Sequence, residues 1–321
     1  MNTKKLTGFT LAGLLFLSGC QAGKTAGGKS VVASTSQGNI FADSIYSTLS
    51  NTSSGKTALF SYVLDTLISK KYPATNAMKK NADDMVENIK ASYKSQKGDD
   101  YEKKLNSDLK SAGYKSIDDY RKKVIYSYQY AELMKKYVKD HFDEVVEDYY
   151  NYASPRKLSI IKVSAINTSN PTKIEKANLK EVQDLLAAGK SFADVAKGYS
   201  ADTTKNAKGN LGIVDKKVSS LSDTYGSAVY DAAFTLTEGK TSSVITGKGG
   251  FYLLHCDSTK KEDIKKELKT VDINSPLITY DNYMVYLAFK TYKINYKDNT
   301  IKAAIEETIT KNLNKRKEER K

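Results

Sequence analysis

The chain of 321 residues contains no tryptophan, only two cysteines and only two histidines. His141 and His255 lie far from any serine motif, which excludes a serine-protease triad. His255 and Cys256 are adjacent, so on a strand they point to opposite faces and cannot share one metal ion. We therefore expect neither a metal site nor a cofactor.

Beyond the first twenty residues, no apolar run is long enough to span a membrane. Within them, a basic pair at positions 4 and 5 precedes a short apolar run, Phe9–Leu17. This order indicates a signal peptide over residues 1–19. Its ending, Leu-Ser-Gly-Cys, resembles the lipobox of bacterial lipoproteins. That resemblance implies cleavage before Cys20 and acylation of its thiol, for example with palmitate.

An acylated Cys20 would leave Cys256 without a disulfide partner. We expect Cys256 to be a small, buried, apolar residue on a strand. Residues 20–30 are small, polar and glycine-rich, and we expect a flexible tether there. The chain is then a lipid-anchored protein at the extracytoplasmic face of the cell membrane. The alternative is an ordinary secreted protein whose cysteine occupies this position by chance.

The charge is strongly basic, with a formal net charge of +14 at pH 7. A secretion signal argues against nucleic acid as the partner. The polyanions outside a bacterial membrane are lipid headgroups and phosphate-rich wall polymers, and a basic surface would speed the encounter with them. A surface that only confers solubility is the alternative.

Hydrophobic periodicity divides the rest of the chain into three segments. Residues 31–155 have helical periodicity, which ends near a Ser-Pro pair. Residues 156–257 combine β-branched strands with short helices, and their polar stretch Ser200–Gly212 is expected to be a loop. Residues 258–321 are helical again, and we expect them to pack on the N-terminal helices and to fray at the charged end. The predicted fold class is α+β, with an α+β domain inserted into a mostly helical one.

Four blocks of the middle segment resemble the parvulin family. The first, Gly189–Asp202, is similar to the pattern G-x-x-F-x-x-x-A-x-x-x-S-x-D. Gly209–Gly212 corresponds to the end of G-G-D-L-G, and Ala232–Ser242 to A-x-F-x-L-x-x-G-x-x-S. Gly250–Leu254 occupies the place of G-Y-H-I-I. With the lipobox and the helical flanks, the whole chain resembles the PrsA-type foldases, whose helical chaperone domain is of the SurA and PrsA type.

The resemblance implies peptidyl-prolyl cis–trans isomerase (rotamase) chemistry without a cofactor, but three positions depart from the family pattern. Ile160 stands where parvulins have the histidine of R-H-I-L. Tyr252 replaces the histidine of G-Y-H-I, and Asn210 replaces the acidic residue of G-G-D-L-G. The barrier to rotation about a peptide bond is about 18–20 kcal/mol. Loss of these three groups removes most of the polar network that would lower it.

The apolar proline pocket of the family has counterparts in Leu211, Val229 and Phe234. We therefore expect a membrane-anchored foldase or holdase that binds unfolded secreted proteins without ATP. A true isomerase that uses Tyr252 and Asn210 is a second hypothesis, and a solute-binding or adhesive lipoprotein is a third. The oligomeric state is left open, with a homodimer among the alternatives.

Overall fold

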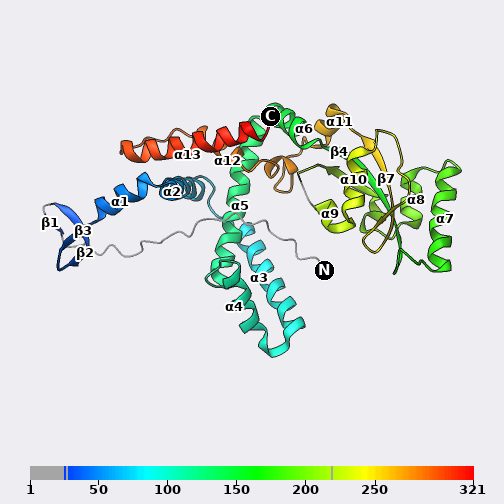
Figure 1. The fold of residues 1–321 in the computed structure, drawn as a ribbon, viewed down its shortest axis with the longest axis horizontal. Helices are drawn as coiled ribbons and strands as arrows, with labels where there is room; N and C mark the ends of the chain where they lie inside the picture. Colours follow the sequence, from blue (N-terminus) through cyan, green and yellow to red (C-terminus); the bar gives the residue numbers. More distant parts are fainter. Residues whose placement is uncertain (1–24, 27, 218–219) are drawn as a thin grey trace. The chain divides into compact units, whose positions relative to one another are not determined.

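The structure is a computed structural model that describes residues 25–26, 28–217 and 220–321 (Figure 1). The signal peptide and Cys20 lie outside these residues. The chain divides into two compact units, and each is described by itself. No helix among the described residues combines the length and the apolar composition needed to cross a membrane.

The first unit joins the chain up to Lys136 with Asn282–Lys321. It begins with a small antiparallel sheet of three strands in the order β1-β2-β3. The strands are β1 (Thr25–Ala26), β2 (Lys29–Thr35) and β3 (Gly38–Phe41). The helices that follow are α1 (Ala42–Asn51), α2 (Ser53–Lys71), α3 (Asn76–Lys97), α4 (Tyr101–Ser111) and α5 (Ile117–Asp140), with the 3-10 turn η1 (Gly98–Asp100) before α4. From the C-terminal segment come α12 (Met284–Lys290) and α13 (Asn299–Glu318).

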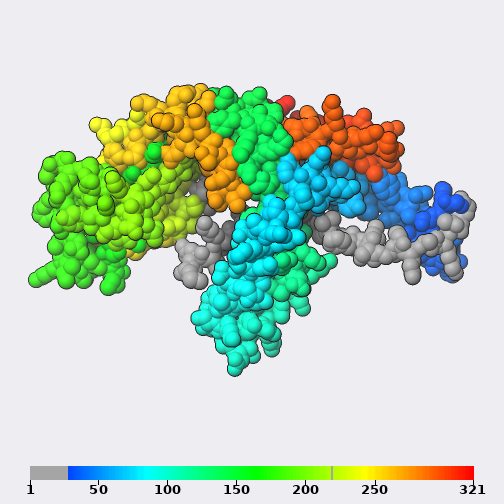
Figure 2. Space-filling model, turned by 180° about the vertical axis from the view of Figure 1, so that it is seen from behind, coloured from blue at the N-terminus to red at the C-terminus, as the bar shows by residue number. Residues whose placement is uncertain are grey.

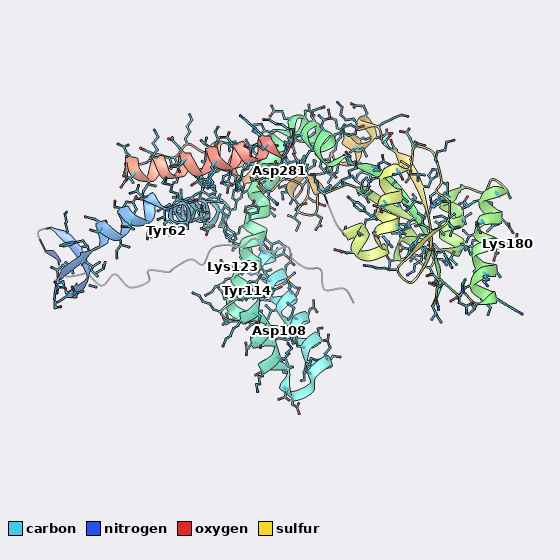
Figure 3. All side chains as sticks on the ribbon, viewed as in Figure 1. Tyr62, Asp108, Tyr114, Lys123, Lys180 and Asp281 are labelled. Carbon is cyan, nitrogen blue, oxygen red and sulfur yellow. The ribbon has the colours of Figure 1, made fainter. Side chains whose placement is uncertain are left out.

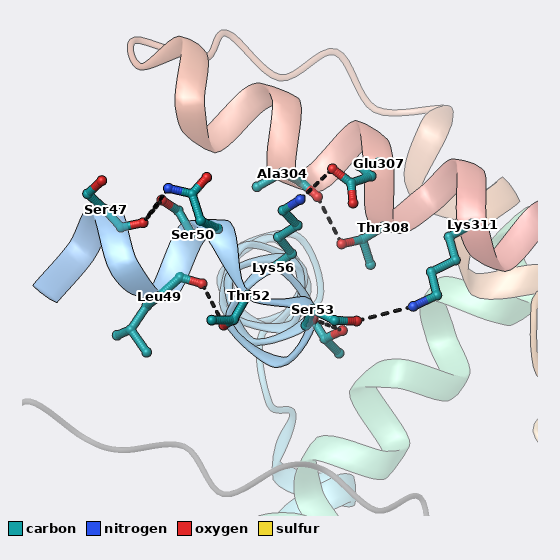
Figure 4. A network of polar contacts seen from close by, with 12 residues as sticks. Ser47, Leu49, Ser50, Thr52, Ser53, Lys56, Ala304, Glu307, Thr308 and Lys311 are labelled. Atoms are coloured by element: carbon teal, nitrogen blue, oxygen red, sulfur yellow. Dashed lines mark hydrogen bonds and ion pairs between the residues drawn. The ribbon is translucent and has the colours of Figure 1, made fainter.

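Helix α13 packs against α2, although the two are far apart in the sequence (Figure 2). Their polar contacts include an ion pair between Lys56 Nζ and Glu307 Oε2 at 2.5 Å, and a hydrogen bond from Lys311 Nζ to Ser53 Oγ at 3.1 Å (Figure 4). Exposed ion pairs contribute at most about 1 kcal/mol. Apolar packing must therefore provide most of the stabilisation.

Phe60 of α2, which is 3% exposed, also contacts the other C-terminal helix. Its ring lies 4.8 Å from the ring of Tyr286 and 5.0 Å from that of Phe289, centroid to centroid. Both partners belong to α12, so the C-terminal helices complete the core of the N-terminal ones.

The second unit, Tyr137–Asp281, contains a four-stranded antiparallel sheet in the order β5-β4-β7-β6. The strands are β4 (Arg156–Ser164), β5 (Asn210–Val214), β6 (Ile245–Gly247) and β7 (Gly250–Ser258). Its helices are α6 (Phe142–Ala153), α7 (Lys173–Ala187), α8 (Phe192–Tyr199), α9 (Ser220–Tyr225), α10 (Ser227–Thr235) and α11 (Lys261–Glu267), with 3-10 turns η2 (Thr203–Ala207) and η3 (Pro276–Ile278).

Alternation along β4 separates two cores. Leu158 and Ile160 point to the face covered by α9 and α10, whereas Ile161 and Val163 point to the face covered by α7 and α8 (Figure 1). Both cores exclude solvent almost completely, and Cys256 is a free, buried thiol in the first, as its place on a strand predicted. Lys180 marks the outer, solvated side of α7 (Figure 3).

The α+β fold class agrees with the sequence prediction, while several local expectations differ. Strand β5 begins at Asn210, inside the expected loop, because half-buried edge strands carry little apolar alternation. Strands β1 and β2 occupy part of the expected tether, where β1 pairs with the start of β2. The charged C-terminus stays helical to Glu318, since its last four helical residues are Lys, Arg, Lys and Glu, which are good helix formers.

The compact sheet unit also extends beyond the expected limits of 156–257 at both ends. Helix α6 and the segment up to Asp281 join it because their buried tyrosines contact one another, with the rings of Tyr149 and Tyr280 5.0 Å apart. Of the expected C-terminal segment, the part after Asp281 groups with the N-terminal helices and the part before it does not.

Replacement of Phe60 by alanine tests the shared helical core. The substitution should cost about 3–5 kcal/mol, the usual loss for a buried phenylalanine. Hydrogen exchange should then accelerate in α2 and in α12 together. Tyr62→Ala is the matched control, because Tyr62 is 63% exposed and extends away from α2 (Figure 3). Faster exchange in α2 with α12 unaffected would contradict a common core.

Candidate functional site

Five of the sequence-predicted site residues converge on one face of the sheet. Ile160, Val229 and Tyr252 are fully buried members of the same apolar core. Leu211 and Phe234 are partly buried and pack against that core from its rim. The predicted proline-pocket residues and the two former histidine positions therefore belong to one apolar core, with Leu211 and Phe234 at its rim; we call the side of the sheet that carries this core the pocket face.

The position of Ile160 depends on the close approach of Gly209. The Ile160 N–H donates to the Gly209 carbonyl at 2.8 Å. Gly209 has φ +81°, and a Cβ there would lie 2.6 Å from the Ile160 carbonyl oxygen. Only glycine fits such a contact. The glycine of the quoted motif thus holds β5 against β4 at the centre of the site.

Tyr252 cannot stand in directly for a histidine, because its hydroxyl already has a partner. It donates to the Lys248 carbonyl at 2.5 Å, and its ring meets the Tyr225 ring edge-on at 5.5 Å. Burial, with the nearby Asp202 charge, raises the pKa of Tyr252. The Tyr252 hydroxyl therefore stays protonated at neutral pH and donates its hydrogen bond to the Lys248 carbonyl.

Asn210 is exposed and belongs to neither of the two sheet cores. Its side-chain oxygen accepts a hydrogen bond from the Gly212 N–H at 2.8 Å. This contact shapes the start of β5 and occupies the amide oxygen. Asn210 therefore acts in local structure, apart from the buried residues around Tyr252.

Three polar side chains that the sequence did not predict lie at one end of the pocket face. They are Lys162, Asp202 and Tyr225. Lys162 pairs with Tyr252 across β4 and β7, and its ammonium lies 5.8 Å from the centre of the Tyr252 ring. Ser200 Oγ accepts from the Lys162 N–H and from the Asp202 N–H, both at 3.1 Å. This bridge holds Asp202 beside β4.

Asp202 is buried, and its Oδ1 accepts from the N–H and the hydroxyl of Thr204 at 2.9 and 2.6 Å. Burial, the Asp202 charge and a hydrogen bond to Asp202 together raise the pKa of Tyr225. The final acidic residue of the first quoted motif was the signal that could have identified Asp202. No sequence motif pointed to Tyr225, because the helix α9 that carries it was not expected.

Arg156 fixes the opposite end of the pocket. Its Nη1 donates to the carbonyls of Ala233 and Leu236 at 2.9 and 2.6 Å. Its guanidinium lies 5.7 Å from the centre of the Phe234 ring. These contacts hold the end of α10 on β4 and place Phe234 at the rim.

The site can therefore bind an apolar group, but it presents few free polar atoms for chemistry. At the two former histidine positions, Ile160 offers only an aliphatic side chain, and the Tyr252 hydroxyl already donates to the Lys248 carbonyl. Among the described residues, no three His, Cys, Asp or Glu side chains are grouped as metal ligands.

Comparisons with known proteins identify relatives of the domain and of the chain. Residues 160–258 match the family model of the PPIC-type PPIASE (rotamase) domain. Foldase protein PrsA of Clostridium botulinum (strain Loch Maree / Type A3) is 30% identical over 232 residues, which span 65% of this chain and 66% of that protein, slightly under two thirds of its length. Foldase protein PrsA of Bacillus subtilis (strain 168) is 27% identical over 303 residues, 92% of this chain and 91% of that protein. The crystal structure of PrsA from Bacillus subtilis aligns with 87% of this chain and 98% of its own, at 24% identity and a TM-score of 0.41.

The thiol of Cys256 reports on the integrity of the pocket face. Burial raises its pKa above the ordinary value of 9.0, although the Arg156 charge opposes the shift. In a Cys20→Ser variant at pH 9.0, we expect Cys256 to resist a thiol reagent in the native protein and to react at once in urea. A native rate equal to the rate in urea would show that the core around Cys256 is open to solvent.

Proposed function

Since this chain belongs to the PrsA-type foldases of the parvulin class, we propose that it binds proline-containing segments of unfolded secreted proteins while accelerating peptidyl-prolyl rotation weakly or not at all. The main support is the pocket face itself. Its apolar part is continuous from Leu211 to Phe234, whereas its former catalytic positions hold Ile160 and a Tyr252 hydroxyl that is already bonded. The chain therefore keeps the apolar residues that would bind a proline and lacks the polar groups that would catalyse its rotation.

The energetics of the pocket suit weak, exchangeable binding. Burial of a client proline or aliphatic side chain yields about 25 cal/mol per Å² of apolar area. Much of that gain is lost to ordering of the client chain. A site of this kind can hold and release segments repeatedly without ATP.

We further propose that the protein is anchored through acylated Cys20 at the extracytoplasmic face of the cell membrane. The lipobox-like ending at Cys20 supports this placement. One acyl chain gives marginal membrane binding, so a durable anchor needs two or more. Anionic wall polymers are proposed as additional contacts of the basic surface.

A true isomerase remains the second candidate, because Lys162, Asp202 and Tyr225 cluster around Tyr252. Of these, the Lys162 ammonium contacts the Tyr252 ring, and no hydrogen bond from it is among the described contacts. A cation here could approach a client carbonyl. This arrangement would replace the missing histidines with different groups.

A paired assay of the purified protein distinguishes the two candidates. We expect suppression of aggregation of an unfolded secreted protein, together with no acceleration in a protease-coupled prolyl isomerisation assay. Tyr252→Phe should leave both results unchanged, and Leu211→Ser should weaken client binding by about tenfold, near the 1.4 kcal/mol expected for part of one apolar contact. Acceleration that disappears in Tyr252→Phe would instead establish the isomerase.

Anchoring is tested separately with the full chain expressed in a Gram-positive host. Labelled palmitate should be incorporated into the protein, which should sediment with membranes. Cys20→Ser should abolish both results, while Cys256→Ser, the matched control, should leave them intact. Membrane association that persists without Cys20 would contradict the lipid anchor.

A further inference from the structure

A cavity of about 390 Å³ adjoins the pocket face within the sheet unit. One wall contains Leu211, Val214, Leu221 and Tyr225, which belong to or pack against the pocket core. Leu211 is also a predicted proline-pocket residue. The cavity is therefore continuous with the surface on which clients are proposed to bind.

The other wall comes from a different part of the chain. Asn274, Pro276 and Thr279 line it, and all three lie beyond residues 160–258, which match the isomerase-domain model. We define Asn274–Thr279 as the second wall. A minimal domain that ended at residue 258 would not possess it.

The second wall is held in place by buried contacts. Leu277 of η3 is completely buried, and the Ser275 hydroxyl caps η3 by accepting from the Leu277 N–H. Directly after the wall, the Tyr280 hydroxyl donates to Asp148 Oδ2 at 2.7 Å. These contacts give the wall a fixed position rather than that of a loose loop.

Tyr149 of α6 links the second wall to the floor of the cavity. Its ring contacts the Tyr280 ring at 5.0 Å, and its hydroxyl donates to Asp215 Oδ2 at 2.7 Å. Asp215 lines the cavity directly after β5, and its Oδ1 accepts from the Lys217 N–H at 2.8 Å. Tyr149 is fully buried, so it is a positioning residue for both sides.

The lining identifies the kind of ligand that fits. Branched aliphatic side chains and Pro276 offer apolar contact, while Asn274, Thr224 and Thr279 offer amide and hydroxyl groups. A lining that combines apolar and polar groups in similar measure suits an extended peptide, whose side chains need apolar contact and whose backbone needs hydrogen bonds. Asp215 lies at the floor, where its carboxylate accepts hydrogen bonds from the Tyr149 hydroxyl and the Lys217 N–H.

From this geometry we propose that Asn274–Thr279 forms the second wall of the client groove and makes the site select extended apolar segments over an isolated proline unit. The proposal rests on the proposed client-binding function and specifies its ligand. The volume is near the lower end of ligand pockets, which span roughly 300–1,000 Å³, and it adds contact area beside the proline pocket. Residues that flank the client proline would occupy it.

The test compares two fluorescent peptides on the full chain: an apolar decapeptide with a central proline, and the tetrapeptide Ala-Ala-Pro-Phe. Wild type should bind the decapeptide at least about tenfold more tightly. Asn274→Trp, or Thr279→Trp if the first does not fold, should remove most of this preference and leave tetrapeptide binding unchanged. Ile273→Trp is the matched control, because Ile273 is exposed and does not line the cavity.

Each outcome has one meaning. Wild type that binds neither peptide overturns the proposed client binding itself. Wild type that binds both, with the preference unchanged in Asn274→Trp and Thr279→Trp, overturns the second wall alone. A change in oligomeric state in these variants, measured by sedimentation, would assign the groove to a second copy of the chain and also overturn the proposal.

Tyr149→Phe provides an independent readout of the same wall. It removes the hydroxyl bond to Asp215 and retains the ring. Because Tyr149 positions the second wall, Tyr149→Phe should weaken decapeptide binding several-fold and change tetrapeptide binding little. An equal loss of both affinities would indicate a merely structural role.

Discussion

The antiparallel pairing of β4 with β7 determines which side chains reach the pocket, and the remainder of the site depends on it. Opposite each other across this pair lie Ile160 with Leu254 and Lys162 with Tyr252. A slip of β4 by one residue would turn Ile160 and Lys162 to the other core, where α7 and α8 pack. Gly209 completes the arrangement by bringing β5 to Ile160 at hydrogen-bonding distance.

This pairing places the aliphatic side chain of Ile160 where an isomerase of this family would need a titratable group. Ile160 is buried in the core, and the Tyr252 hydroxyl satisfies the Lys248 carbonyl instead of facing a ligand. A buried hydroxyl without a partner costs about 1–3 kcal/mol, which keeps the Tyr252 hydroxyl engaged. The same substitutions leave the apolar surface intact. A pocket that retains its shape and loses its polar groups supports the proposal of client binding with little or no catalysis.

The sequence predicted the parts of this site that depend on short-range pattern. Ile160 and Tyr252 were identified from motif position and Val229 as the counterpart of a family pocket residue, and the structure gathers them in one core. It did not predict Asp202 beside Tyr252, because a bridge through Ser200 brings them together across the fold. Nor did it predict the second wall, because Tyr149 and Tyr280 meet across more than a hundred residues of sequence and neither belongs to a recognisable motif.

The central claim is that this pocket binds a prolyl peptide without catalysing its isomerisation. Exchange NMR of a labelled proline-containing decapeptide, at concentrations where the protein binds it, tests this directly. The account predicts line broadening and shifts from binding, with no exchange cross-peaks between the cis and trans resonances beyond those of the free peptide. Cross-peaks that appear only when the protein is added would contradict it.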